Sequence, residues 1–591
     1  MSNAAIIDNP ELVIGLVGPI GVDLDAVIGY LKKALQEVHY KSKVIHITTV
    51  MGDILPHLKV DDESYTGRYK SLIRNADTVR RITNNQAALA CLAISEIRRL
   101  RQELHKKLPR KKARDTPALG TAFIIRQFKR EEEINLLRQV YGRKFVQISV
   151  FSDADERRKQ LIKKIKGYRT TIVEDVDAEK QAIDLISIDN NEIGDDYGQR
   201  VSDVFHLGDV FVQGESTKEA EDTIERFIKA FFGHNGLSPT KAEYGMYAAA
   251  GAALRSLDLS RQVGAAIFSQ HGEVITLGCN EVPKAFGGTY WSDDDGDKAR
   301  DFEEGYDGNH SRKLRMVHDL VDRMGKLGFL SDKLVKAGPP VEQIRRMMSE
   351  KLISGSRVMD IIEFGRIIHA EMSAITDAAR LGKALKDSVL FCTTFPCHMC
   401  AKHIVSSGIR KVTFLEPYPK SHAKDLHSDS ITFSCTEESA KVLFEPFIGI
   451  SPRRYRDIFE KKKRKDDEGK ATMWNKGKPI PRIEDRGSSY IDNEEPAISL
   501  VVRHIIDLQR TPKPASRPRV RRVQDPITVK NNLKTCGVTR SFVPPVRSPE
   551  GPRHRSPGGV RRPATRPRRT SASPARGPRV ALSMSGRACM C

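Results

Sequence analysis

The chain has 591 residues, enough for several domains, and its 39% hydrophobic and 29% charged content is typical of a globular protein. It contains no run of about 18 apolar residues, and its first residues lack the basic start and apolar stretch of a secretion signal. Nine scattered cysteines do not form a disulfide framework. We therefore expect a cytoplasmic protein that makes no membrane contact.

The net charge of +22 first suggests a nucleic-acid partner, but it is unevenly distributed. Residues 509–591 hold 20 lysines and arginines against two acids, which leaves only +4 for the first 508 residues. This tail is rich in Arg, Pro, Ser and Gly and cannot bury a core, so we expect it to be disordered. Two interpretations stay open: non-specific nucleic-acid binding by counterion release, or translation of a GC-rich frame past a shifted stop.

The first domain, expected over residues 1–235, alternates strands and helices. This alternation predicts an α/β fold with a parallel sheet. The expected elements are a strand at 12–17, a helix from Leu24, a strand at 43–50, a long helix at about 76–108, strand–helix–strand over 118–151, and an amphipathic helix at 217–232.

A turn of phosphate-binding type follows the first strand. Gly18 and Gly21 match the start of a P-loop, whose backbone N–H groups and following helix face an anion. Leu24 and Asp25, however, stand where the P-loop requires lysine and Ser or Thr. The residues that would contact β/γ-phosphates and Mg²⁺ are therefore absent, so we expect a degenerate loop without NTPase activity.

A second domain is expected over residues 241–455. It begins with a helix and two strands joined by a Gly turn, and residues 291–356 interrupt it as a helical insertion. Strands and helices around the motifs described next complete it, and the stretch SAKVLFEPFIGI is expected to be its last helix. Residues 456–508 form a charged extension before the tail at 509–591.

The motif H-x-E, followed by P-C-x-x-C, carries the chemistry of this domain. His369, Cys397 and Cys400 supply three zinc ligands, and three protein ligands with an open fourth position are typical of catalytic Zn²⁺. Glu371, two residues from His369 at a helix start, can point at the zinc-bound water. It would take the water proton, deliver it to ring nitrogen N3 and assist the departure of ammonia.

A closed structural zinc site is the alternative interpretation. It would need a fourth protein ligand, and His398, His403 or Cys392 could be imagined in that role. Their spacing follows no known zinc-site pattern. The order of the two motifs, with Pro396 before the cysteines, favours a deaminase site.

These residues resemble the deoxycytidylate (dCMP) deaminase family. The resemblance rests on IIHAEMSAI, on TTFPCHMCAKHIVSSGIRKVTFLEPYP, and upstream on SLDLSRQVGAAIF and GEVITLGCNEVP. It implies a cytidine-deaminase fold with a mixed sheet between helices, His369, Cys397 and Cys400 as ligands, and Glu371 as proton shuttle. It also implies that Asn280 holds the sugar. Arg261 is a candidate phosphate contact.

The two-domain arrangement resembles bacterial anti-phage deaminases, in which such a domain follows a P-loop nucleotide-kinase-like domain. The resemblance implies deamination of free dCMP, dCTP or both, which would deplete deoxycytidine nucleotides during phage infection. We expect a homo-oligomer, with a regulatory RNA or nucleotide as the candidate ligand of the first domain. Two other functions stay open: a polynucleotide cytidine deaminase, and a nucleotide-binding regulator with a vestigial deaminase site.

Overall fold

The computed structural model describes residues 7–510, except for short gaps. The gaps are 170–172, 191–196, 215–216, 295–298, 351, 354–355, 419–420, 434–439, 462, 473, 475–478 and 484–486. The tail expected from residue 509 lies outside the described residues beyond Arg510. None of the described helices combines the length and the apolar character needed to cross a membrane.

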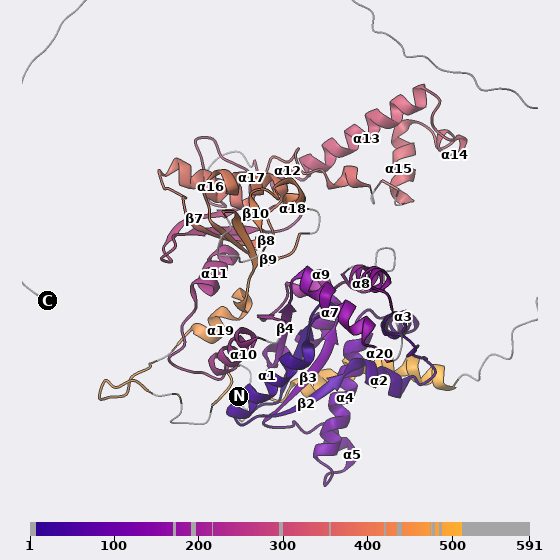
Figure 1. Ribbon diagram of the computed structural model, residues 1–591, viewed down its shortest axis with the longest axis vertical. Coiled ribbons are helices and arrows are strands. Elements are labelled where there is room, and N and C mark those ends of the chain that lie inside the picture. The colour runs from indigo at the N-terminus through magenta and orange to yellow at the C-terminus, as the bar shows by residue number, and fades with distance from the viewer. Residues whose placement is uncertain are drawn as a thin grey trace, which may run out of the picture. The chain divides into compact units, whose positions relative to one another are not determined.

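The first six-stranded sheet has the order β12-β5-β4-β1-β3-β2. Figure 1 labels its strands β2, β3 and β4. Its strands are β1 (Leu12–Val17), β2 (Lys41–His46), β3 (Thr121–Phe128), β4 (Phe145–Phe151), β5 (Val210–Gln213) and β12 (Gly449–Ile450). Strands β1 to β5 are parallel, as expected. The expectation of a purely parallel sheet is wrong, however, because β12 pairs antiparallel with β5 at one edge.

Helices cover both faces of this sheet. One core lies beneath α1 (Leu24–Glu37) and α10 (Lys218–Phe231), and the alternate residues of β1 fill both cores. On the other face lie α4 (Ala88–Leu104), α6 (Glu131–Tyr141) and α20 (Tyr490–Arg510). The first domain is therefore an α/β domain with a mixed sheet, and α20 comes from the region expected to be a charged extension.

The long helix expected at about 76–108 is two helices. They are α3 (Tyr65–Thr83) and α4, and the break between them begins at Asn84, whose φ of 46° is left-handed. Asparagine tolerates this conformation better than most residues, so it ends α3. The remaining helices of this domain are α2 (Ile47–Ile54), α5 (Arg110–Arg114), α7 (Ala154–Lys166), α8 (Asp175–Asn190) and α9 (Val201–Phe205).

The second six-stranded sheet has the order β10-β11-β9-β8-β6-β7. Its strands are β6 (Gly264–Phe268), β7 (Val274–Cys279), β8 (Val389–Thr394), β9 (Lys411–Glu416), β10 (Ile431–Thr432) and β11 (Val442–Pro446). β6 is antiparallel to β7 and β8, whereas β8, β9, β11 and β10 are parallel, so the expected mixed sheet is confirmed. Helices α11 (Lys241–Ala253), α16 (Ala370–Arg380), α17 (His398–Ser406) and α18 (Ala423–Leu426) accompany it.

The last helix expected in this domain, SAKVLFEPFIGI, is wrong. Part of this stretch forms β11 of the second sheet, and part forms β12 of the first. The apolar residues Val442, Leu443 and Phe444 follow one another in β11, and Phe444 is buried in the core beside β9.

Four helices lie in the described part of the segment predicted to be an insertion. It contains α12 (Asp301–Glu304), α13 (Gly308–Lys326), α14 (Asp332–Val335) and α15 (Pro340–Ser349), followed by the short 3-10 helix η2 (Arg357–Asp360). Val317, Val321 and Ile353 form a small core of its own. Lys313 donates to the Met359 carbonyl at 2.8 Å and so joins α13 to the segment that leads to His369.

Candidate metal centre and catalytic pocket

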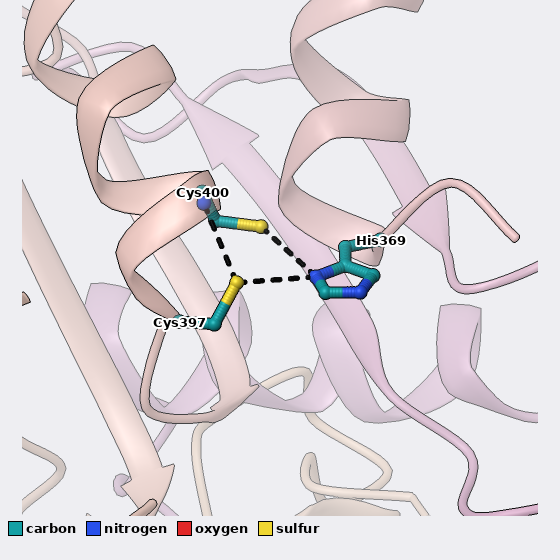
Figure 2. A group of neighbouring side chains, drawn as sticks. All are labelled: His369, Cys397 and Cys400. Carbon is teal, nitrogen blue, oxygen red and sulfur yellow. Dashed lines mark hydrogen bonds between the residues drawn. The ribbon is translucent and has the colours of Figure 1, made fainter. Parts of the chain in front are cut away.

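Two helix starts bring the three expected zinc ligands together (Figure 2). His369 is the N-cap of α16, Cys397 is the N-cap of α17, and Cys400 lies in the first turn of α17. His369 Nδ1 lies 3.3 Å from Cys397 Sγ and 3.4 Å from Cys400 Sγ. All three ligand atoms lie within 4.8 Å of one another.

These residues fit a zinc ion. Atoms that bind one zinc at about 2.0–2.3 Å in tetrahedral geometry lie roughly 3.5 Å apart, close to the separations found here. One imidazole and two thiols are ligands that zinc prefers. Among the described residues no fourth side chain joins the cluster. The set is therefore that of an open site rather than a closed structural one.

None of the three alternative fourth ligands joins the cluster. His398 Nε2 lies 3.4 Å from Glu363 Oε1, and His403 Nδ1 lies 2.7 Å from the Met399 carbonyl oxygen. Cys392 is buried in β8, outside the group of three ligand atoms.

The electrostatics of the cluster favour one ionised thiol. Hydrogen bonding from Cys400, and then from His369, lowers the pKa of Cys397 to about 4 despite its burial. The same contact with Cys397 raises the pKa of His369 to about 9. Burial raises the pKa of Cys400. Because the thiolate is the metal-binding form, Cys397 is prepared for a cation in this position.

Glu371 lies beside the ligands on the first turn of α16. Its side chain is buried, and Cys400 Sγ lies 3.4 Å from its Oε2. Burial is the main cause that raises the pKa of its carboxyl, and the nearby Cys397 adds to the effect. A carboxyl whose pKa is raised towards neutrality is suited to exchange protons as a general acid and base.

A pocket of about 230 Å³ opens onto Glu371, His369 and Cys397. Asn280 and Arg261, the two expected substrate contacts, also line it. Asn280 Oδ1 accepts from the Val263 N–H at 2.7 Å, and its Nδ2 donates to the Arg261 carbonyl at 2.8 Å. Asn280 therefore also holds the segment before β6 in place. The Arg261 guanidinium is half exposed and pairs with Glu416 at 2.8 Å.

The segment predicted to be an insertion adds residues to this pocket that were not among the predicted site residues. Asp301, Asp307 and Asn309 line it together with Asp258 and Tyr418. Asn309 donates to the Ile361 carbonyl at 3.0 Å and so fixes the segment that precedes the zinc motif. Nothing in the local sequence indicates this contact, because it depends on how the insertion returns to the domain.

A buried ion pair fixes the base of the insertion next to Asn280. The Arg300 guanidinium donates to Glu281 Oε2 at 2.5 and 3.0 Å, and Glu281 also accepts from the Leu257 N–H. Both side chains are at most 3% exposed. The insertion is thus attached directly to the turn that carries Asn280.

The loop of the first domain that contains Gly18 and Gly21 is held by its own chain. The Gly18 carbonyl accepts from Gln127 Nε2 at 2.7 Å and from Lys129 Nζ at 2.8 Å. The Ile20 N–H donates to the buried Asp189 carboxylate at 2.7 Å, and Lys129 also pairs with Asp189. Gly21 has a φ of 97°, a left-handed conformation that favours glycine.

Comparison with known sequences matches residues 239–416 to the family described as the cytidine and deoxycytidylate deaminase zinc-binding region. The deoxycytidylate deaminases of Enterobacteria phages T2 and T4 are each 45% identical over 53 residues, which is 9% of this chain and 28% of theirs. ComE operon protein 2 of Bacillus subtilis is 39% identical over 57 residues, which is 10% of this chain and 30% of that protein. The chain thus matches less than a third of the length of these relatives.

Among solved structures, the chain resembles dCMP deaminase of the cyanophage S-TIM5. The apo form matches with 17% identity and a TM-score of 0.19, over 36% of this chain and 99% of the other. The complex with dCMP and dUMP matches with 18% identity and a TM-score of 0.21, over 36% of this chain and 98% of the other.

The zinc ligands and the family match lie in the same part of the chain. His369, Cys397 and Cys400 all fall within residues 239–416. The chain therefore contains a zinc-binding cytidine deaminase domain with a His–Cys–Cys cluster.

Proposed function

We propose that the chain is a hydrolytic deaminase of free deoxycytidine nucleotides, converting dCMP, dCTP or both to dUMP or dUTP and ammonia. One observation carries the proposal: the buried Glu371 and two of the zinc ligands, His369 and Cys397, line the same pocket as Asn280 and Arg261. The names of the phage relatives, deoxycytidylate deaminases, support the same substrate class.

The chain's own residues supply proton transfer and orientation. His369, Cys397 and Cys400 would hold a zinc ion, which would supply Lewis acidity to activate water near neutral pH. Glu371 accepts a proton from the attacking water and gives it to N3 of the cytosine ring while a C4–O bond forms. Glu371 then takes the proton of the new C4 hydroxyl and gives it to the amino group, so that the C4=O bond forms as the C4–N bond breaks and ammonia leaves.

Arg261 and Asn280 are proposed as the substrate contacts outside the base. The free Oδ1 lone pair and the second Nδ2 hydrogen of Asn280 can reach a sugar hydroxyl. Arg261 is the cation among the lining residues, and its half-exposed guanidinium could exchange Glu416 for a 5′-phosphate.

The charge of the pocket argues against a polynucleotide substrate. Among its described lining residues, Asp258, Asp301 and Asp307 accompany one lysine or arginine, Arg261. A groove that follows a nucleic-acid backbone requires cations along its length, whereas one arginine suits the 5′ end of a free nucleotide. A vestigial site is disfavoured too, because the ligands and Glu371 keep the arrangement that catalysis requires.

We further propose that the first domain is a degenerate P-loop, nucleotide-kinase-like domain without NTPase activity. The Asp189 carboxylate already accepts a hydrogen bond from the Ile20 N–H. Asp23 caps the start of α1 by accepting from the Ala26 N–H. Two carboxylates thus lie where phosphate would bind in a working loop, and they would repel it. A regulatory RNA or nucleotide remains its candidate ligand.

In cells, this activity would deplete deoxycytidine nucleotides during phage infection, and the chain would act as a homo-oligomer. Exposed apolar side chains on the insertion, among them Leu320, Leu327 and Phe329, support an assembly surface. Comparing phage plating and dCTP pools in hosts that express the native chain or Glu371→Ala tests the role in defence. Light scattering of the pure protein tests the assembly.

The substrate is tested with the zinc-loaded protein and dCMP, dCTP, CMP, CTP and a cytosine-containing oligonucleotide. We expect ammonia release from the free deoxynucleotides. Release from the oligonucleotide alone would refute the proposal in favour of a polynucleotide deaminase. Release from none of them would favour the regulator with a vestigial site.

A further inference from the structure

We propose that a phosphorylated small molecule binds a second cavity, in the first domain, between α4, α5 and α20. This cavity has a volume of about 530 Å³, within the range of roughly 300–1,000 Å³ common for small-molecule sites. The proposal does not depend on the deaminase activity, since none of the residues involved lies in the catalytic pocket.

Four arginines line the cavity: Arg98, Arg99, Arg114 and Arg503. The first three already pair with carboxylates of the described chain, whereas the exposed Arg503 makes no ion pair with a described residue. Guanidinium groups carry several N–H donors in a planar fork, which matches the oxygens of a phosphate group. Arg503 and the donors that the existing pairs leave open therefore favour an anionic ligand.

Arg98 gives the strongest sign of a missing partner. It is only 4% exposed, its Nη2 donates to Asp115 at 3.2 Å, and it also pairs with Glu495. Its Nε is nevertheless buried and donates to no described residue, and the same holds for Ser95 Oγ. Buried polar atoms in folded proteins almost always have a partner, so two such atoms at one cavity indicate a polar ligand.

Much of the rest of the wall is apolar. Between α4 and α20 the cavity is lined by Leu92, Ile498 and Val502, and Ser499 lies among them. A ligand that satisfies both parts of the wall carries phosphate at one end and an apolar or planar body at the other. Nucleoside phosphates have this chemistry.

The surroundings of the cavity would attract such an anion. Lys106, Lys107, Lys111 and Lys112 lie on and just before α5, the helix that carries Arg114, and all four are exposed. Clustered cations raise the local concentration of anions and speed their association. The chain's own basic tail, with a net charge of +18 from residue 509, is not a complementary occupant.

Isothermal titration of the zinc-loaded full-length protein with ATP and with inorganic pyrophosphate, at physiological salt, tests this site. We expect one ATP bound per chain, with weaker binding of pyrophosphate, which lacks the apolar body. Arg98→Gln and the exposed Arg503→Glu should each weaken ATP binding about tenfold or more, as expected when a charge-assisted hydrogen bond is lost. Ser499→Phe, which fills the cavity, should abolish it.

Lys107→Glu is the matched control, because it reverses an exposed charge nearby that does not line the cavity. We expect less than about a threefold effect, since salt screens charges beyond roughly 8 Å. Three outcomes would each overturn the proposal. Neither ATP nor pyrophosphate binds, or Lys107→Glu weakens binding as much as Arg503→Glu does, or binding is unchanged in both Arg503→Glu and Ser499→Phe. Binding of a single-stranded oligonucleotide alone would overturn it too. Circular dichroism shows whether Arg98→Gln is folded, and the other two variants decide the outcome if it is not.

Discussion

Glu371 is the residue on which the proposed chemistry depends most directly. Glu371→Gln keeps the shape of the side chain but removes its ability to accept a proton. We expect turnover to fall by about 10²–10⁴-fold, the usual contribution of a general acid–base group. Zinc content, measured by elemental mass spectrometry, should remain one per chain, since His369, Cys397 and Cys400 are unchanged.

Glu273→Gln is the control for this experiment, because Glu273 is an exposed carboxylate in the turn between β6 and β7. It should leave ammonia release unchanged. Retained turnover in Glu371→Gln would show that another group moves the proton. Loss of zinc in that variant would show instead that Glu371 supports the metal site.

At this scale the sequence predicted the residues that act locally. His369 and Glu371 share one helix start, and Cys397 and Cys400, three residues apart, share another, so the sequence alone places the two members of each pair near each other. The structure brings the three predicted ligands together. Asp307 and Asn309 could not be predicted, because they reach the pocket only through the path of the insertion.

Gly278 determines how closely α16 approaches the second sheet. A Cβ atom at this position of β7 would lie 2.2 Å from the Ala370 carbonyl oxygen and 2.5 Å from the Ala374 nitrogen. Both atoms are backbone of the helix that begins after His369, so they cannot move aside alone. Gly278→Ala should therefore displace α16, with a cost of about 1–3 kcal/mol for overpacking. We expect turnover to fall at least tenfold, because misplacement by about 1 Å can cost 10²-fold.

Thermal unfolding and steady-state kinetics measure the two effects. Gly251→Ala is the matched control, since a Cβ atom there, in α11, would meet nothing within 4 Å. It should leave activity unchanged and stability equal or slightly higher, because alanine is the better helix former. Native activity in Gly278→Ala would show that α16 can shift without disturbing Glu371.

The elements were predicted well where their signals were local. The helix beginning at Leu24 shows its buried positions in its 3.6-residue spacing, and β1 is an apolar run before a turn. SAKVLFEPFIGI was misassigned because a short apolar run fits a helix or a strand equally well. Its last residues pair with β5, more than 200 residues earlier, and only the tertiary fold decides that pairing.

On the scale of the whole molecule, α20 returns the chain to its first domain. Arg101 on α4 is fully buried and is hydrogen-bonded to both Glu11 and Glu494, and the Tyr141 hydroxyl also donates to Glu494 at 2.8 Å. Removing one partner of such a network leaves buried charge uncompensated. Glu494→Ala should therefore lower the free energy of unfolding by about 3–5 kcal/mol.

Urea unfolding of the full chain measures this cost. Glu468→Ala is the control, because the pair between Glu468 and Lys470 is exposed and is expected to contribute at most about 1 kcal/mol. Equal stability of the two variants would show that α20 does not anchor to the first domain through this network.

The basic tail accounts for most of the net charge but for none of the proposed site. Residues 511–591 carry 19 lysines and arginines against two acids, and every residue that lines the catalytic pocket precedes them. Truncation after Arg510 should leave the turnover of dCMP unchanged. It should weaken binding to single-stranded DNA and reduce its salt dependence, because fewer phosphate-bound counterions are released. A large loss of turnover in the truncated protein would show that the tail contributes to catalysis, and unchanged DNA binding would exclude it as the source of nucleic-acid affinity.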